Sequence, residues 1–97
     1  MQFIVIGHDL PDALPRRLEV RQKHIDLCND MKAKGTMLYG VALVDDDGKM
    51  KGSMVVCDFP DEDALDAYLK EEPYITGNVW GKVEVLPCKV GPSFAAK

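Results

Sequence analysis

Two places in this sequence carry residues suited to acid–base chemistry, and the first is a histidine on a predicted helix. His24 lies in residues 20–34, whose apolar side chains recur at helical spacing, and it falls near the middle of the apolar arc. A histidine there is either a hydrogen-bonded core residue or a general acid or base, because imidazole titrates near neutral pH. Arg21, one turn earlier, is either a solvated flank residue or a fixed positive charge for an anionic substrate.

The second place is Glu71-Glu72-Pro73-Tyr74, where two carboxylates close a second predicted helix. Negative charge at a helix C-terminus opposes the helix dipole, and such unfavourable placements are enriched at functional sites. Glu71 is most simply interpreted as a solvated residue. Glu72, held by the following proline, could orient His24 and stabilise its protonated form. Whether the two residues meet depends on the fold, since they are far apart in the sequence.

Two further polar positions are weaker signals for a site. Gly52-Ser53 begins a predicted strand, and its hydroxyl could bind a ligand oxygen, although an ordinary strand start also explains the dipeptide. Asp9, after His8 where the first strand ends, is either a substrate-binding residue or part of an Asx turn. The sequence contains no close-spaced metal ligand set, phosphate loop, nucleophile elbow or dinucleotide fingerprint. We therefore expect no metal and no cofactor.

The elements that position these residues follow the order strand, helix, strand, strand, helix, strand. The predicted strands cover residues 2–7, 36–44, 50–59 and 80–87, and the predicted helices cover residues 20–34 and 61–72. Gly35 is a natural helix stop, and Asp47-Gly48 predicts a hairpin turn. This order indicates a ferredoxin-like α+β fold, a four-stranded antiparallel sheet with both helices on one face. The other face is apolar, so we expect a second copy of the chain to cover it as a homodimer.

Length, charge and cysteine content exclude several classes of protein. The 97 residues suit a single domain, which we place at residues 1–90, with a loosely ordered tail at 91–97. A net charge of −4 without a basic stripe argues against a nucleic-acid partner. No stretch approaches the ~18 apolar residues of a membrane span, and the first residues lack the features of a secretory signal. The three widely spaced cysteines form no disulfide framework, so we expect a cytoplasmic location.

In their order and spacing, these features resemble the YciI-like (YCII-related) family from Met1 to about Cys88. The matching pattern consists of Asp9, Arg17, Arg21-Gln22-Lys23-His24, Gly35, Gly40, Gly52-Ser53, Glu72-Pro73-Tyr74, Val79, Val83 and Pro87. The resemblance implies a dimeric α+β barrel with a histidine and an acidic partner in a cleft near the dimer interface. It makes His24 the proton-transfer residue and Glu72 its orienter. Arg21, Ser53 and Tyr74 would line the pocket.

This chain departs from the family pattern at two of those positions. Glu72-Pro73 stands where the family usually has Asp-Pro, which makes the carboxylate side chain one methylene longer. Gly40-Val41 stands where the family has Gly-Pro. The longer side chain of Glu72 affects whether its carboxylate can contact the His24 imidazole. The loss of the proline after Gly40 loosens one wall of the expected cleft.

Two functions follow as hypotheses. The first is a cofactor-free lyase or isomerase-type enzyme acting on a small anionic organic molecule, with Arg21 neutralising developing charge. The resemblance also implies this, since a lyase-type role on ring-derived substrates is attached to some members. The second is a non-catalytic dimeric module that binds a small metabolite or modulates a partner. A purely structural role would leave polar residues at 21, 24 and 72 as an unexplained cost on apolar faces.

Overall fold

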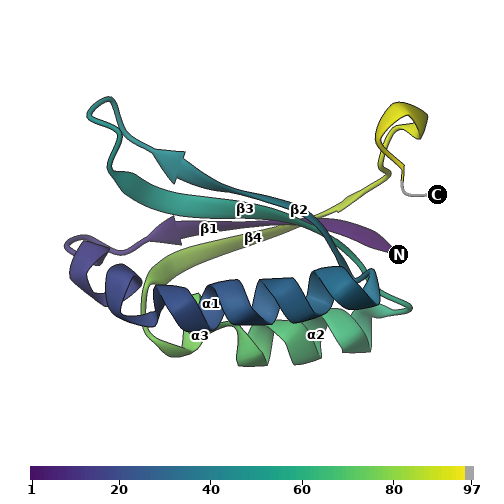
Figure 1. Ribbon diagram of the computed structural model, residues 1–97, viewed down its shortest axis with the longest axis horizontal. Helices are drawn as coiled ribbons and strands as arrows, with labels where there is room; N and C mark the ends of the chain where they lie inside the picture. The colour runs from purple at the N-terminus through teal and green to yellow at the C-terminus, as the bar shows by residue number, and fades with distance from the viewer. Residues whose placement is uncertain (96–97) are drawn as a thin grey trace.

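The fold is a four-stranded antiparallel sheet that carries its helices on one face (Figure 1). The computed structural model describes residues 1–95. Its elements in chain order are β1 (Gln2–Asp9), α1 (Leu14–Lys34), β2 (Met37–Val44), β3 (Met50–Asp58), α2 (Glu62–Glu71), α3 (Pro73–Thr76), β4 (Trp80–Cys88) and the 3-10 turn η1 (Pro92–Phe94). This arrangement confirms the predicted ferredoxin-like α+β fold.

Strand β1 is central, as its apolar residues on both faces predicted. The strand order is β2-β3-β1-β4, and every neighbouring pair is antiparallel. Phe3 and Val5 face the helices and are buried, whereas Ile4 and Ile6 alternate onto the open face. Neighbouring strands flank β1 on both edges, and Ile4 and Ile6 on the open face are half-buried.

Helix α1 begins at Leu14, so the predicted start at residue 20 was wrong. Pro15 sits in the first turn, where its missing N–H and fixed φ favour a helix N-terminus. Residues 14–19 do not show the apolar pattern of a helix, because Arg17, a charged residue, occupies one of the positions that face the core. The predicted end is confirmed: Gly35 takes φ 79° and its N–H bonds to the last turn of the helix.

The second helical region consists of two helices rather than one. Asp61 caps α2 by accepting a hydrogen bond from the Ala64 N–H at 2.9 Å, as predicted. Pro73 ends that helix but also begins the short helix α3. Glu72 lies at the junction, and its carboxylate accepts from the Tyr74 N–H. The junction therefore places a carboxylate in the layer between the helices.

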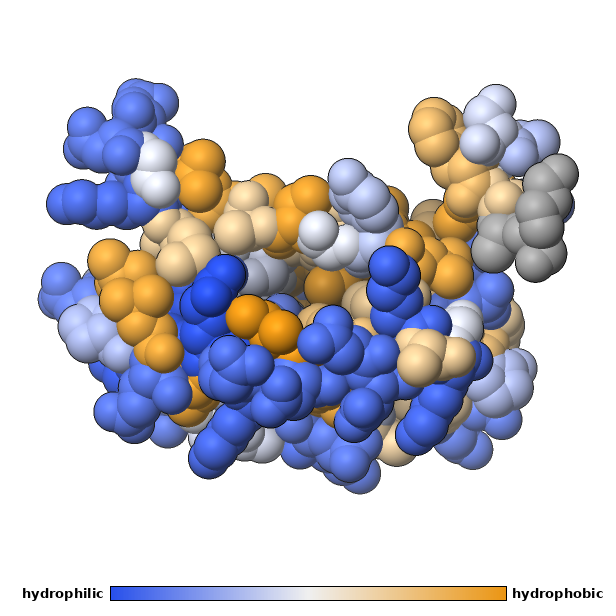
Figure 2. All heavy atoms as spheres, in the orientation of Figure 1, coloured by the Kyte–Doolittle hydropathy of each residue, from blue (hydrophilic) through white to orange (hydrophobic). Residues whose placement is uncertain are grey.

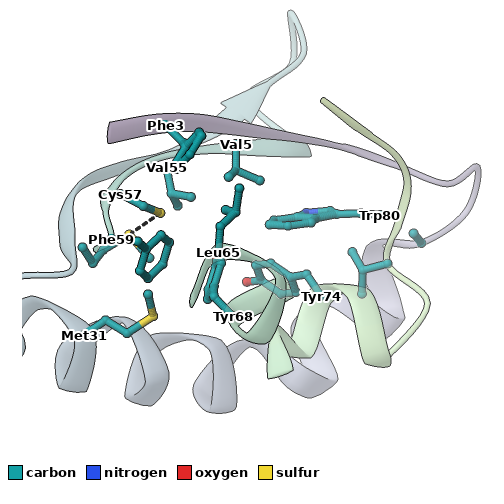
Figure 3. Close-up of a cluster of buried hydrophobic side chains, with 13 residues drawn as sticks. Phe3, Val5, Met31, Val55, Cys57, Phe59, Leu65, Tyr68, Tyr74 and Trp80 are labelled. Atoms are coloured by element: carbon teal, nitrogen blue, oxygen red, sulfur yellow. Dashed lines mark hydrogen bonds between the residues drawn. The ribbon is translucent and has the colours of Figure 1, made fainter. Parts of the chain in front are cut away.

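The core lies between the sheet and the helices, where aromatic and aliphatic side chains from both layers meet (Figure 3). Trp80, at the start of β4, covers Gly7 of β1. A Cβ atom at Gly7 would lie 2.1 Å from Cδ2 of the Trp80 ring, so no larger residue fits there without movement. Trp80 also approaches Tyr74, with ring centroids 5.7 Å apart, and thereby ties α3 to the sheet.

The open face of the sheet carries exposed apolar side chains. The strand register places Tyr39, Val41 and Leu86 on that face, where they are 67%, 39% and 47% exposed. After β4 the chain turns through η1, and residues 96–97 of the predicted tail lie outside the described residues. Across residues 1–95, no helix combines the length and the apolar character needed to cross a membrane.

Candidate active site

A cleft of about 380 Å³ lies between helix α1 and strands β2 and β3. It is open because β2 presents two small residues, Gly40 and Ala42, toward the helix layer opposite Val55 and Ser53. In Figure 2, apolar atoms are recessed between the polar outer face of α1 and the strands above it. The cleft thus has an apolar wall on the sheet and a polar, charged wall on the helix.

His24 and Glu72, the predicted catalytic residues, are in contact at this cleft. Nδ1 of His24 lies 2.6 Å from Oε1 of Glu72. The glutamate side chain is fully buried, while that of His24 is 14% exposed and lines the cleft. The Glu72 side chain, one methylene longer than the aspartate expected from the resemblance, therefore reaches the imidazole.

The Glu72 carboxylate also receives hydrogen bonds from two tyrosine residues. The hydroxyl of Tyr68 donates to Oε2 at 2.6 Å, and the Tyr74 N–H donates to Oε1 at 3.2 Å. Burial, and then the nearby carboxylate, raise the pKa of Tyr68 far above its usual value, so the phenol stays protonated and donates. Because an ionised carboxylate only accepts, His24 must donate from Nδ1. Its Nε2 is then the nitrogen left for proton transfer.

The ring of Tyr74 packs against the imidazole of His24. The two rings are stacked, with centroids 4.1 Å apart and planes at 22°. The guanidinium of Arg17 lies 4.4 Å from the centroid of the same tyrosine ring. Tyr74 is 1% exposed and its pKa is raised by burial, against the lowering effect of Arg17 and Arg21. It therefore orients the imidazole, and it is also among the residues that line the cleft.

Arg17 is the site residue that the sequence interpretation missed. It is 2% exposed, and Nη1 donates to both carboxylate oxygens of Asp9 at 3.0 and 3.3 Å. Nη2 donates to Oγ of Ser53 at 2.6 Å. Arg17 lies one turn before Arg21, so a helix that begins at Leu14 places both on the side of the cleft. The signal in the sequence is Pro15, which favours the first turn of a helix and thus includes Arg17 in α1.

The remaining predicted residues occupy different positions around the cleft. Ser53 lines the cleft from β3, and Arg21 lines it from α1. Asp9 lies behind Arg17 and is not among the cleft residues; burial raises its pKa, and Arg17 opposes that shift. Arg21 is exposed, and no hydrogen bond or ion pair engages its side chain within residues 1–95. Its charge is therefore available to a ligand.

Cys28 adds a thiol beside the imidazole. Its Sγ lies 3.5 Å from Nε2 of His24, a spacing that a cysteine nucleophile and its base could share. Burial, and then the Glu72 charge, raise the pKa of this thiol to about 11. It is therefore neutral near pH 7, and we assign it no nucleophilic role. Within residues 1–95, no group of three or more His, Cys, Asp or Glu residues could hold a metal ion.

Sequence comparison places the chain in a family. The model of the YCII-related domain matches residues 1–89, and the chain belongs to this family. Protein YciI of Escherichia coli is 30% identical over 95 residues, covering 92% of this chain and 97% of that protein. An uncharacterized protein of Haemophilus influenzae is 26% identical with the same coverage. The family membership predicted from the sequence is thus confirmed.

Structural comparison supports the fold assignment. The chain is similar to 5-chloro-2-hydroxyhydroquinone dehydrochlorinase (TftG) from Burkholderia phenoliruptrix AC1100, solved in complex with 2,5-dihydroxybenzoquinone. The TM-score is 0.83 at 20% identity, covering 98% of this chain and all of that one. An antibiotic biosynthesis monooxygenase is similar with a TM-score of 0.54 at 18% identity, covering 94% of this chain and 98% of that one. At these identities the similarity concerns the fold.

Proposed function

We propose that this YCII-related protein is a cofactor-free enzyme of lyase or isomerase type that acts on a small anionic organic molecule. The observation that carries the proposal is the contact between His24 and the fully buried Glu72 at the edge of a cleft. A carboxylate that holds one imidazole nitrogen leaves the other in a defined protonation state for acid–base work. The buried position of Glu72 keeps that arrangement away from competing water.

In the proposed reaction, Nε2 of His24 takes a proton from a carbon next to a carbonyl group of the substrate, which a hydroxylated ring offers in its keto tautomer. The C–H electron pair forms an enolate, and Arg21 at the cleft edge stabilises the added negative charge. The enolate then expels a leaving group from a neighbouring carbon, or it regains the proton at another carbon. Glu72 stabilises the imidazolium formed in the first step, in which it remains hydrogen-bonded to Nδ1.

The similar fold of TftG supports a lyase-type reaction. A dehydrochlorinase removes a proton and a chloride from its substrate, and the elimination described above likewise removes a proton and a leaving group. Its ligand, 2,5-dihydroxybenzoquinone, is a flat ring that carries acidic oxygens. A cleft of about 380 Å³ falls within the range of small-molecule sites. We therefore propose hydroxylated ring compounds as the first substrates to test.

The test is turnover of a panel of hydroxylated ring compounds, including 5-chloro-2-hydroxyhydroquinone, followed by absorbance and by solvent deuterium exchange in NMR spectra. We expect His24→Gln to lower the rate at least about 100-fold, the usual scale of general acid–base catalysis. The matched control is Asp26→Asn, because Asp26 is exposed on α1, is hydrogen-bonded to Gln22, and does not line the cleft. Its rate should stay within about twofold of the wild type, a change below RT.

Two results would contradict the enzyme proposal. One is equal turnover by the wild-type protein and His24→Gln. The other is binding of panel members by the wild-type protein with neither turnover nor exchange, which would favour the non-catalytic binding module.

We further propose that the protein works as a cytoplasmic homodimer whose subunits meet through the open sheet face. Tyr39, Val41 and Leu86 on that face are exposed in one copy, and apolar patches of this kind usually mark interfaces. Tyr39→Lys should shift the protein toward the monomer in sedimentation velocity at fixed concentration. A wild-type protein that sediments as a monomer at all concentrations would contradict the proposal.

A further inference from the structure

We propose that Ser53 donates a hydrogen bond to an acceptor oxygen of the ligand, and that Arg17 and Asp9 are positioning residues that fix it in this role. The inference rests on the proposed function and narrows its substrate class. The ligand must carry a carbonyl, enolate or phenolate oxygen, because a hydroxyl proton presented by Ser53 needs an acceptor.

The first step is the direction of the hydrogen bond at Ser53. Nη2 of Arg17 lies 2.6 Å from the serine Oγ, and a guanidinium N–H can only donate. The serine oxygen is therefore the acceptor in this contact, and its own proton must point elsewhere. No acceptor for that proton is hydrogen-bonded to the hydroxyl within residues 1–95. Ser53 lines the cleft, so a bound molecule can supply the missing acceptor.

The second step is the rigidity of Arg17. Its other terminal nitrogen is held by both oxygens of Asp9, and its guanidinium lies 4.4 Å from the Tyr74 ring centroid. The arginine and aspartate side chains are 3% and 7% exposed, so water does not compete for these contacts. A donor fixed in this way needs no reorganisation when charge develops on the ligand oxygen. The Asp9–Arg17 pair thus orients the Ser53 hydroxyl, and the opposite charges of the aspartate and the arginine largely cancel each other.

The third step is the placement of Ser53 relative to the proton-transfer residue. Ser53 lies on the β3 floor of the cleft, and His24 lies on the α1 wall of the same cleft. A ligand bound between them can offer a carbon-bound proton to one side and an oxygen to the other. Arg21 and Lys32, both on α1, also line the cleft and favour an anion. The geometry therefore fits a carbonyl compound that passes through an enolate.

The direct test is binding of 2,5-dihydroxybenzoquinone, measured by isothermal titration calorimetry. Ser53→Ala should raise the Kd at least about tenfold, since it removes a hydrogen bond to a charged oxygen. Ser53→Thr keeps the hydroxyl and should restore affinity to within about threefold of the wild type. Ser93→Ala, in the exposed turn η1, is the control and should leave the Kd unchanged.

Two results would overturn the assignment of Ser53. One is a Kd for Ser53→Ala equal to that of the wild type. The other is a wild-type protein that does not bind the probe below about 1 mM. Thermal melting of each variant checks that it folds. If Ser53→Ala does not fold, the comparison is made with Ser53→Cys, whose thiol is a weak donor and should bind more weakly than Ser53→Thr.

A double-mutant cycle tests the positioning role of Arg17. Arg17→Lys keeps the positive charge but cannot hold Asp9 and Ser53 at once with a planar fork. If the arginine acts through the serine, Arg17→Lys weakens binding in the wild type and has little further effect in Ser53→Ala. Losses that simply add would overturn the positioning role, because a general structural effect of Arg17 would not depend on Ser53.

The same binding assay in the His24→Gln background separates this inference from the proposed function. Adding Ser53→Ala to His24→Gln should weaken binding by the same factor as in the wild type, because the serine contact does not depend on proton transfer. An unchanged factor supports the serine role even if no turnover is ever found. Loss of the factor in the His24→Gln background would overturn a donor role independent of the imidazole.

Discussion

Replacement of the buried carboxylate by Glu72→Ala should cost about 3–5 kcal/mol of the free energy of unfolding, the range for breaking a buried pair. Glu72 is fully buried and accepts hydrogen bonds from Tyr68, Tyr74 and His24. The substitution leaves each of these donors without its partner and leaves a cavity in place of the carboxyl group. Each unpaired buried donor costs about 1–3 kcal/mol, and His24, at the cleft edge, can recover part of that cost through water.

The conservative change Glu72→Gln should be far milder, with a loss of about 1 kcal/mol. Its amide oxygen can still accept from His24 and from the Tyr74 N–H, and its NH2 group can donate to the rotatable Tyr68 hydroxyl. The difference between the two variants therefore measures the unpaired donors together with the cavity that alanine leaves. Turnover should fall in both variants, because neither holds a negative charge beside the imidazolium.

The assay is urea unfolding followed by circular dichroism and Trp80 fluorescence at one fixed protein concentration, since dimer formation would make stability depend on concentration. Glu71→Ala is the matched control, because the neighbouring carboxylate is exposed at the end of α2. Its stability should change by less than about 0.5 kcal/mol. A loss below about 1 kcal/mol for Glu72→Ala, or equal losses for Glu72→Ala and Glu72→Gln, would refute the reasoning.

Other predictions concern the packing and chemistry around the cleft. Gly7→Ala should lower stability by about 1–3 kcal/mol in urea unfolding, because the added Cβ lies 2.1 Å from the Trp80 ring; unchanged stability would contradict the packing. Iodoacetamide should label Cys28 slowly at pH 8 and about tenfold faster per pH unit until the pH nears its pKa of about 11. Mass spectrometry measures the labelling rate. At pH 7, a rate in the folded protein equal to that in urea would contradict the prediction, because it would show an accessible thiolate. Gly40→Val should weaken 2,5-dihydroxybenzoquinone binding at least about tenfold by filling the cleft beside Val55, whose Cγ1 would lie 3.3 Å from the added Cβ; thermal melting checks that the variant folds, and unaltered binding would place the ligand elsewhere.

The features that could be predicted from the sequence are those with local causes. Gly48 takes φ 79° in the hairpin turn, and Gly35 takes φ 79° after α1, as residues without a Cβ atom do readily. Asp61 caps α2 through a bond to an N–H three residues later. Each depends only on neighbours in the chain, so its position followed from residue type and spacing.

The features that escaped prediction depend on contacts across the fold. Arg17 is charged and would be expected to be exposed, but it is buried with its two terminal nitrogens donating to Asp9 and Ser53, while its Nε has no hydrogen-bond partner within residues 1–95. The cleft itself exists because β2 crosses above α1 with Gly40 facing it. The contact between His24 and Glu72 could be predicted only from the family resemblance. No spacing rule relates residues on α1 and α2, because these helices meet where α3 packs against both.

The place of Glu72 at the α2–α3 junction affects how relatives of this protein should be interpreted. The same carboxylate ends one helix, begins the next and accepts from a core phenol, so folding alone would favour its retention. A relative that has lost all activity would still tend to keep it. The imidazole is different, because it lies at the cleft edge and holds no helix end in place. A relative that lacks the histidine while keeping the acid would therefore be a candidate for a protein that retains the scaffold without the chemistry.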